Sequence, residues 1–214
     1  LIRNFVDQIL NYDVIVVGAG SAGAPLAARL SDNPDISVLL LEQGPYYRSL
    51  DQFPGNIRNS YEDFIKSDTV HIWSCPAQYT EHDGESGRAY RGRLIRGGSS
   101  INGAVFLRGL PEDFDSWASL GNDEWGYSQV LPYFRKLEHD LDFGGEVHGQ
   151  EGPIPVRRPT DGELLPATRA FLRACLSYGF EYNADVNHPD AIGVGPLALN
   201  DLNGLRVNTA IAYL

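Results

Sequence analysis

Asp13-Val-Ile-Val-Val-Gly-Ala-Gly-Ser-Ala-Gly-Ala-Pro-Leu-Ala-Ala-Arg-Leu30 is the stretch that decides the fold of this chain. Its four β-forming residues, 14–17, predict a buried parallel strand, and its Ala/Leu-rich end predicts a helix that runs to about Leu30. Between them, Gly18, Gly20 and Gly23 follow the G-x-G-x-x-G spacing of a dinucleotide-binding turn. In such a turn the glycines allow a tight bend, a close approach to a pyrophosphate and close packing of helix on strand.

A second apolar run, Val38 to Glu42, predicts the next parallel strand, and it ends on an acid. Glu42 lies nineteen residues beyond Gly23, where a carboxylate accepts hydrogen bonds from the hydroxyls of an adenosine ribose. The helix N-terminus favours a pyrophosphate through its free N–H groups and partial positive charge. Together these features predict an adenine dinucleotide site. The motif alone does not separate NAD from FAD, because both carry the same ADP half.

The composition excludes several classes of protein. The 214 residues are 43% hydrophobic, enough for one or two globular domains. The net charge is −11 and no run of Lys or Arg exceeds two, so we expect no nucleic-acid partner. No apolar run reaches the roughly 18 residues of a membrane span. Cys75 and Cys175 have no metal or redox spacing and are expected to be buried thiols of a reduced, cytoplasmic compartment, with one disulfide left open.

Both ends of the sequence indicate a fragment, or one piece of a nicked or two-chain protein. The chain contains no methionine, so Leu1 is not an untouched initiator residue. The other end, 208–214, stops on an apolar run with no glycine cap, proline stop or polar tail.

The remaining segments give a coarse order of elements. The stretch from Glu42 to about Ser60 is too irregular for a helix and is expected to wrap a ligand. The other expected elements are short strands at 70–79 and 89–94 joined by a polar turn, helices at 111–120 and 127–140, a strand at 154–156 and a helix at 164–178.

A second motif, Arg91-Gly-Arg-Leu-Ile-Arg-Gly-Gly-Ser-Ser-Ile-Asn-Gly-Ala-Val-Phe-Leu-Arg-Gly109, is dense in glycine and hydroxyl groups before it turns apolar. Such an order suits a cofactor cradle, in which Gly97 clears side chains from the path of a planar ligand and Asn102 presents an amide to it.

With the first motif, this segment resembles the glucose-methanol-choline (GMC) oxidoreductase family, whose signature runs Gly-(Lys/Arg)-x-(Leu/Ile)-Gly-Gly-(Ser/Gly)-Ser-x-(Ile/Val)-Asn. Further likeness lies in Trp73 with Pro76, Arg108-Gly109 before 113–117, 125–134, 152–156 and 206–214. The resemblance implies FAD as the cofactor and an α/β fold. Residues 1–150 would form a Rossmann-like FAD-binding domain with a cofactor-wrapping excursion at about 44–90. Residues 151–214 would begin an incomplete α+β substrate domain on an antiparallel sheet.

The resemblance also implies roles for single residues. The residues expected at the cofactor are Gly18, Gly20, Ser21 and Gly23 at the pyrophosphate, Glu42 at the ribose, Arg93 and Ser100 at the diphosphate region, Gly97 beside the ligand, and Asn102, Gly103, Ala104 and Val105 along the flavin ring. Trp73 is either an aromatic residue near the cofactor or a plain core tryptophan.

The sequence departs from the family pattern at two places. Arg96 stands where the signature has the first glycine of its Gly-Gly pair. We expect the Arg96 side chain to point away from the cofactor, because the neighbouring glycines indicate crowding. Ile101 stands where some members attach FAD covalently through a histidine, so the resemblance implies noncovalent FAD.

The catalytic residues are expected beyond residue 214, because the family's late histidine base has no counterpart here. The histidines are expected to be structural or on the surface, and their spacing predicts no metal site: His71, His82, His139, His148 and His188. We therefore expect this chain to be inactive alone and to need a second polypeptide that carries the C-terminal part of the fold. The family's reaction moves hydride from a small-molecule alcohol to flavin N5.

Three functions remain open at this point. The first is an FAD-dependent alcohol oxidase or dehydrogenase. The second is a hydroxynitrile lyase of the same family with structural FAD. The third is a noncatalytic subunit that binds a dinucleotide.

Overall fold

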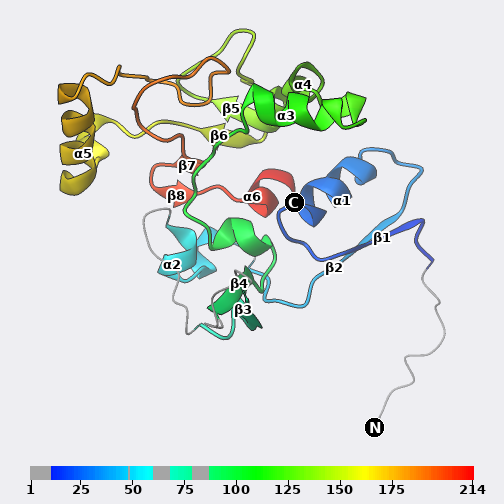
Figure 1. Ribbon diagram of the computed structural model, residues 1–214. Helices are drawn as coiled ribbons and strands as arrows, with labels where there is room; N and C mark the ends of the chain where they lie inside the picture. Colours follow the sequence, from blue (N-terminus) through cyan, green and yellow to red (C-terminus); the bar gives the residue numbers. More distant parts are fainter. Residues whose placement is uncertain (1–10, 48, 60–67, 79–86) are drawn as a thin grey trace. The chain divides into compact units, whose positions relative to one another are not determined.

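The computed structural model describes residues 11–47, 49–59, 68–78 and 87–214 (Figure 1). These residues fall into two compact units. The first comprises Leu1–Gln52, Ile65–Ile101 and Thr209–Leu214, and the second comprises Phe53–Phe64 and Asn102–Asn208, in each case over the described residues. Both units are made of segments that are not contiguous in the sequence. The sequence predicts instead one boundary at residue 150 between an FAD-binding and a substrate domain, and that functional division stays a prediction.

The first unit contains the expected strand, turn, helix and strand. β1 (Val14–Val17) pairs in parallel with β2 (Val38–Leu41), and α1 (Gly23–Ser31) connects them. The turn before α1 begins at Gly18, whose φ is +95°. At Gly23 a Cβ atom would lie 1.9 Å from the carbonyl oxygen of Gly18, so only glycine lets the helix begin this close to the strand.

The rest of the first unit contains a second pair of strands, two 3-10 turns and a short helix. β3 (Ile72–Ala77) and β4 (Gly87–Gly92) form an antiparallel pair in which Ile72 lies opposite Gly92. Two 3-10 turns (Leu50–Gln52 and Gly97–Ser100) and the short helix α6 (Thr209–Tyr213) complete it. α6 packs on α1, and the Arg29 guanidinium lies 5.5 Å from the centre of the Tyr213 ring.

The second unit holds most of the helices. Its helices are α2 (Gly55–Arg58), α3 (Pro111–Ser119), α4 (Tyr127–Leu137) and α5 (Pro166–Ser177), with 3-10 turns at Asp123–Trp125 and Asp161–Glu163. Its strands are β5 (Glu138–Asp140) paired in parallel with β6 (Ile154–Val156), and β7 (Asp201–Leu202) paired antiparallel with β8 (Leu205–Arg206). The strands of the described part form only two-stranded pairs, so the antiparallel sheet of a substrate domain stays a prediction.

Local chemistry explains where the longer helices begin and end. Proline is the first residue of α3 and of α5, a position that needs no hydrogen-bonded N–H group. In α3 the Asp113 carboxylate accepts a hydrogen bond from the Leu110 N–H at 3.0 Å. Gly179, with φ +93°, follows the end of α5.

Four expectations about these elements are wrong. β1 is not a buried strand, because Ile15 is 57% exposed and Val17 is 83% exposed. The stretch after Glu42 is not free of helix, because it contains the turn Leu50–Gln52 and α2. The helix expected to reach residue 140 ends at Leu137, and the next three residues form β5 with two buried carboxylates. Neither cysteine is a buried thiol, since Cys75 is exposed and Cys175 is partly exposed, and both are free.

Two further results concern His82 and the possibility of a membrane-spanning helix. His82 and most of the polar turn between β3 and β4 lie outside the described residues. Within the described part, no helix has the length and apolar character needed to cross a membrane.

Candidate dinucleotide site

A hollow of about 590 Å³ opens in the first unit where β1 and β2 end. Its walls are formed by Val17, Gly18, Gly20, Leu41, Glu42, Gln43, Trp73, Gly92 and Gly97. The structure thus gathers in one place five residues that the sequence assigned to the cofactor, from both glycine-rich motifs. Sequence reasoning missed four lining residues, although each adjoins a predicted residue or lies within the second motif: Val17, Leu41, Gln43 and Gly92.

The two glycine-rich motifs are in direct contact. The Arg96 N–H donates to the Ala19 carbonyl at 2.6 Å, and the Ser99 N–H donates to the Ser21 hydroxyl at 3.1 Å. A Cβ atom on Gly97 would lie 2.8 Å from the Cα atom of Gly20. Because glycines form this contact, the wall beside the start of α1 is bare backbone, which fits a pyrophosphate.

Glu42 is held firmly on the pocket wall. Its Oε2 accepts a hydrogen bond from the Ala19 N–H at 2.9 Å, and its Oε1 accepts one from the Gly44 N–H at 2.8 Å. Each carboxylate oxygen has a second lone pair. The side chain therefore stabilises the glycine turn and retains acceptors suited to ribose hydroxyls.

Trp73 is not a core tryptophan. Its side chain is 47% exposed and lines the hollow. The Arg93 guanidinium carbon lies 4.8 Å from the centre of the Trp73 ring, in cation–π contact. Arg93, the cation predicted for the diphosphate region, thus lies beside the hollow and stacks on Trp73, which forms part of its wall. Ser100, by contrast, is fully buried, so its contact with the diphosphate stays a prediction.

The residues expected along the flavin ring begin the second unit. Asn102 Oδ1 accepts hydrogen bonds from the Ala104 N–H at 3.0 Å and from Arg206 Nη1 at 2.6 Å. Asn102, Gly103 and Val105 are exposed, whereas Ala104 is buried. Sequence reasoning missed Arg206, which is almost fully buried and fixes the Asn102 side chain. Contacts of 102–105 with a flavin ring stay a prediction.

Arg96 faces a different space. Its side chain lines a separate hollow of about 270 Å³ together with Tyr46, Tyr47 and Ile95 in the first unit. Burial lowers the pKa of the Arg96 guanidinium to about 10, so that it is still charged at neutral pH. The described walls of the dinucleotide hollow do not include Arg96. Arg96 therefore lines another hollow than the predicted cofactor site, and its orientation relative to a bound cofactor stays a prediction.

The family model of GMC oxidoreductases matches residues 12–214. The chain belongs to the GMC oxidoreductase family. This family binds FAD, and its members include enzymes that act on alcohols. The paired glycine motifs of this GMC chain and the hollow between them are therefore parts of a flavoprotein fold.

Similar proteins include a GMC-type oxidoreductase of Rhodococcus erythropolis, 40% identical over 202 residues, which cover 94% of this chain and 40% of that protein. The oxygen-dependent choline dehydrogenase of Vibrio vulnificus is 37% identical over 206 residues, covering 95% of this chain and 36% of that protein. The crystal structure of pyridoxine 4-oxidase from Mesorbium loti is similar with a TM-score of 0.83 and 35% identity, covering 95% of this chain and 39% of that chain. The GMC chain thus spans about two fifths of the length of these relatives.

A buried charge cluster lies in the second unit of the GMC chain, and sequence spacing did not reveal it. His148 Nδ1 lies 3.1 Å from Glu138 Oε1 and 3.0 Å from Asp140 Oδ2, and its Nε2 lies 2.7 Å from Asp185 Oδ2. Arg158 binds Asp140 at 2.5 Å and Asp185 at 2.8 Å. Arg108 pairs with Glu138 in the same cluster.

Glu138, Asp140 and His148 have the ligand types of a metal site. Burial tends to lower the pKa of His148, but the hydrogen bonds to Asp140, Asp185 and Glu138 outweigh it and raise the pKa to about 10. Both ring nitrogens of His148 are hydrogen-bonded to carboxylates, and with Arg108 and Arg158 the imidazolium balances the three negative charges. We therefore assign this cluster to folding stability.

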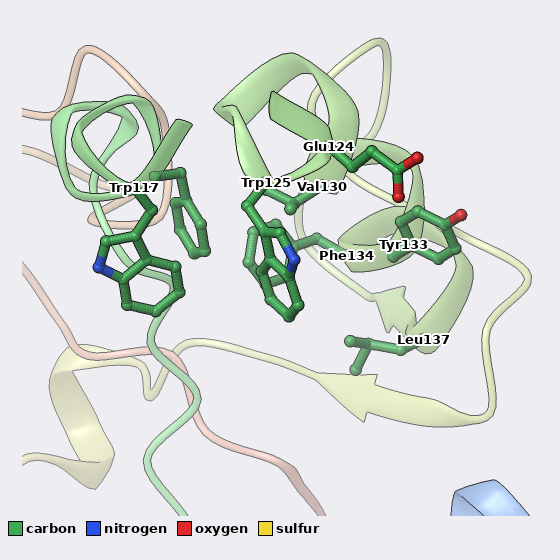
Figure 2. Close-up of a pocket in the computed structure, with 8 residues that line it drawn as sticks. Trp117, Glu124, Trp125, Val130, Tyr133, Phe134 and Leu137 are labelled. Carbon is green, nitrogen blue, oxygen red and sulfur yellow. The ribbon is translucent and has the colours of Figure 1, made fainter. Parts of the chain in front are cut away.

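An aromatic groove of about 610 Å³ lies between α3, α4 and the turn that joins them (Figure 2). Phe114, Trp117 and Trp125 pack edge to face, with ring centres 5.6 and 5.9 Å apart along the row. Trp125 is 53% exposed and Tyr133 is 70% exposed. Figure 2 shows the Glu124 carboxylate and the Tyr133 hydroxyl on one side of the groove, which is otherwise apolar.

Proposed function

We propose that this chain is the FAD-binding part of an oxidoreductase that oxidises a CH–OH group of a small-molecule alcohol to an aldehyde or ketone. The observation that carries the proposal is the joining of both glycine motifs in one hollow, where Gly97 lies against Gly20. FAD, when bound, supplies the hydride acceptor at N5.

In this proposal, different residues bind different parts of FAD. The backbone of Gly18 and Gly20 and the start of α1 contact the pyrophosphate, because glycine leaves this wall without side chains and the helix start carries partial positive charge. The Gly18 N–H itself donates to the Leu41 carbonyl at 2.7 Å and holds the turn against β2. Glu42 accepts hydrogen bonds from the adenosine ribose, and Arg93 adds a positive charge beside Trp73. Asn102, oriented by Arg206, presents its amide to the flavin ring together with Gly103, Ala104 and Val105.

The proton acceptor for the alcohol comes, in this proposal, from the C-terminal portion of the fold. His71 and His148 are buried and bonded to protein groups through both ring nitrogens. A second polypeptide that carries the C-terminal portion would supply the base and complete the substrate site.

The exposed apolar surfaces support such a partner. In the first unit, Val17 of β1 is 83% exposed and Ile15 is 57% exposed, although parallel sheets are normally buried on both faces. In the second unit, the aromatic groove exposes Trp117 and Trp125. We propose that the C-terminal portion of the fold covers both surfaces.

FAD is held without a covalent bond in this proposal. Ile101, an almost fully buried aliphatic side chain, offers no atom for attachment to the flavin. Acid precipitation of the purified flavoprotein checks this prediction, because a noncovalent flavin is released to the supernatant. Yellow colour retained in the washed pellet would overturn it.

The first experiment is a visible absorption spectrum of the purified protein, combined with intact mass to identify every polypeptide present. We expect the bands of oxidised flavin and, with the C-terminal polypeptide added, anaerobic bleaching by an alcohol. A flavin that stays oxidised in the complete complex with every alcohol tested would favour a lyase over an oxidoreductase. A complete complex without flavin would overturn the proposal.

A further inference from the structure

Three side chains of the first unit form a hydrogen-bonded chain outside the dinucleotide hollow. His71 is 7% exposed, and its Nδ1 lies 2.6 Å from Asp68 Oδ2. The Tyr47 hydroxyl is hydrogen-bonded to the other ring nitrogen, Nε2. Asp68 Oδ1 accepts hydrogen bonds from the N–H groups of Val70 and His71, both at 3.0 Å. The imidazole is thus fixed on both sides.

This chain of bonds links the segments that form two walls of the hollow. Tyr47 lies five residues after Glu42, beyond the end of β2, and His71 lies two residues before Trp73 at the start of β3. Tyr47 and His71 are 24 positions apart in the sequence. The Tyr47–His71 bond therefore joins the chain just after β2 to the chain just before β3.

The same segment also fixes Arg93. The His71 carbonyl accepts a hydrogen bond from the Arg93 N–H at 2.6 Å, and the Thr69 carbonyl accepts one from Arg93 Nη1 at 3.4 Å. The Arg93 guanidinium in turn stacks on Trp73. A shift of His71 would move the backbone of Arg93 and the ring on which its side chain rests.

We propose that Tyr47, His71 and Asp68 form a clasp that positions Arg93 and Trp73 for the cofactor. This inference rests on the proposed function, because it assigns the clasp to the same FAD site. His71 is a positioning residue, since both its ring nitrogens bind protein groups. Asp68 orients the imidazole through Nδ1, and Tyr47 anchors it through Nε2.

The physical advantage of the clasp is preorganisation. The chain just after β2 and the start of β3 are joined here by the side chains of Tyr47, His71 and Asp68. The distance between these two parts of the wall therefore depends on the hydrogen bonds of the clasp. If these bonds fix the wall before the ligand arrives, less ordering remains for the binding step. Their loss is then expected to weaken ligand binding more than it weakens the fold.

The test measures FAD affinity by fluorescence titration of the apoprotein. Tyr47→Phe removes one oxygen and keeps the ring, so the fold is expected to survive, and thermal melting checks this. We expect FAD to bind about fivefold to tenfold more weakly, the loss typical of one hydrogen bond. His71→Gln, which cannot span both partners in the same way, is expected to give a loss at least as large. Tyr12→Phe, at an exposed tyrosine ahead of β1, is the matched control and is expected to bind FAD normally.

A double-variant comparison separates positioning from general destabilisation. In an Arg93→Ala background only Trp73 is left for the clasp to position, so Tyr47→Phe is expected to change FAD affinity by a clearly smaller factor than it does in the unaltered protein. A merely structural role would give the same loss in both backgrounds and would overturn the inference. Equal FAD binding by Tyr47→Phe and the unaltered protein would also overturn it. Failure of the unaltered protein to bind FAD would overturn the proposed function and the clasp with it.

Discussion

At the scale of single residues, Gly97 combines two constraints, a positive φ and a close backbone neighbour. Its φ is +52°, and an added Cβ atom would lie 2.8 Å from the Cα atom of Gly20. We predict that Gly97→Ala forces the two motifs apart and weakens FAD binding at least about tenfold, because left-handed strain and a backbone clash act together. Gly98→Ala is the matched control, because its Cβ atom would meet only Ser21 Oγ at 4.0 Å. Fluorescence titration with FAD checks both variants, and equal affinities would contradict the prediction.

For Arg96, by contrast with Gly97, we predict that substitution leaves FAD binding unchanged. Its backbone has φ 92°, which costs a non-glycine residue about 1–2 kcal/mol, and its side chain lines the hollow beside Tyr46. Arg96→Gly is therefore expected to leave FAD retention unchanged, while thermal melting reports the balance between relieved backbone strain and lost side-chain contacts. A large loss of FAD would show that the guanidinium binds the cofactor after all.

At the scale of elements, β5 depends on the buried charge cluster. Removing the His148 cation leaves three carboxylates facing two arginines, and breaking a buried ion pair in this way costs about 3–5 kcal/mol. We predict that His148→Gln lowers the free energy of unfolding by this amount in a denaturant titration near neutral pH. His188→Gln, the same change at an exposed side chain, is expected to cost less than about 0.5 kcal/mol. Equal effects of the two substitutions would contradict the assignment of the cluster to stability.

The same cluster gives a pH dependence with a definite sign. The pKa of His148 is about 10 in the folded chain against an ordinary value of 6.5, so between these values the folded state holds a proton that the unfolded state has released. The stabilising contribution of His148 is therefore complete below about pH 6.5 and is lost as the pH rises toward 10. The stability difference between the unaltered protein and His148→Gln should shrink over this range. A constant difference from pH 6 to 10 would contradict the raised pKa.

At the scale of the whole molecule, the exposed aromatic groove predicts how a C-terminal polypeptide would associate. The chain alone should enhance the fluorescence of an apolar dye, and addition of that polypeptide should suppress it, because buried aromatic side chains dominate association energies. Trp125→Ser is expected to weaken the association at least about tenfold. Tyr178→Ser, at an exposed aromatic outside the groove, is the control. Unchanged association of Trp125→Ser would show that the partner covers another surface.

Sequence reasoning succeeded best where a pattern is local. The strand Val14–Val17 agrees with its predicted bounds, and α1 and β2 end within one residue of theirs, because the period of apolar residues and the spacing of glycines reflect backbone geometry directly. It was less successful where a short segment is decided by distant partners. Residues 138–140 continue the apolar and polar pattern of a helix, yet Arg108, His148 and Arg158 draw their carboxylates into a buried strand.

The sequence by itself determined the family and the dinucleotide motifs, because each motif is a contiguous run whose glycine spacing has one physical use. Only the tertiary structure decided which side chains meet. It placed Ser21 against Ser99, 78 residues apart, placed Arg96 in a separate hollow, and exposed Trp73 on the wall of the dinucleotide hollow. It also bonded Tyr47 to His71 and collected three carboxylates around His148. These contacts join residues that are far apart in the sequence, and a local pattern of residues does not specify which distant segments come together in the fold.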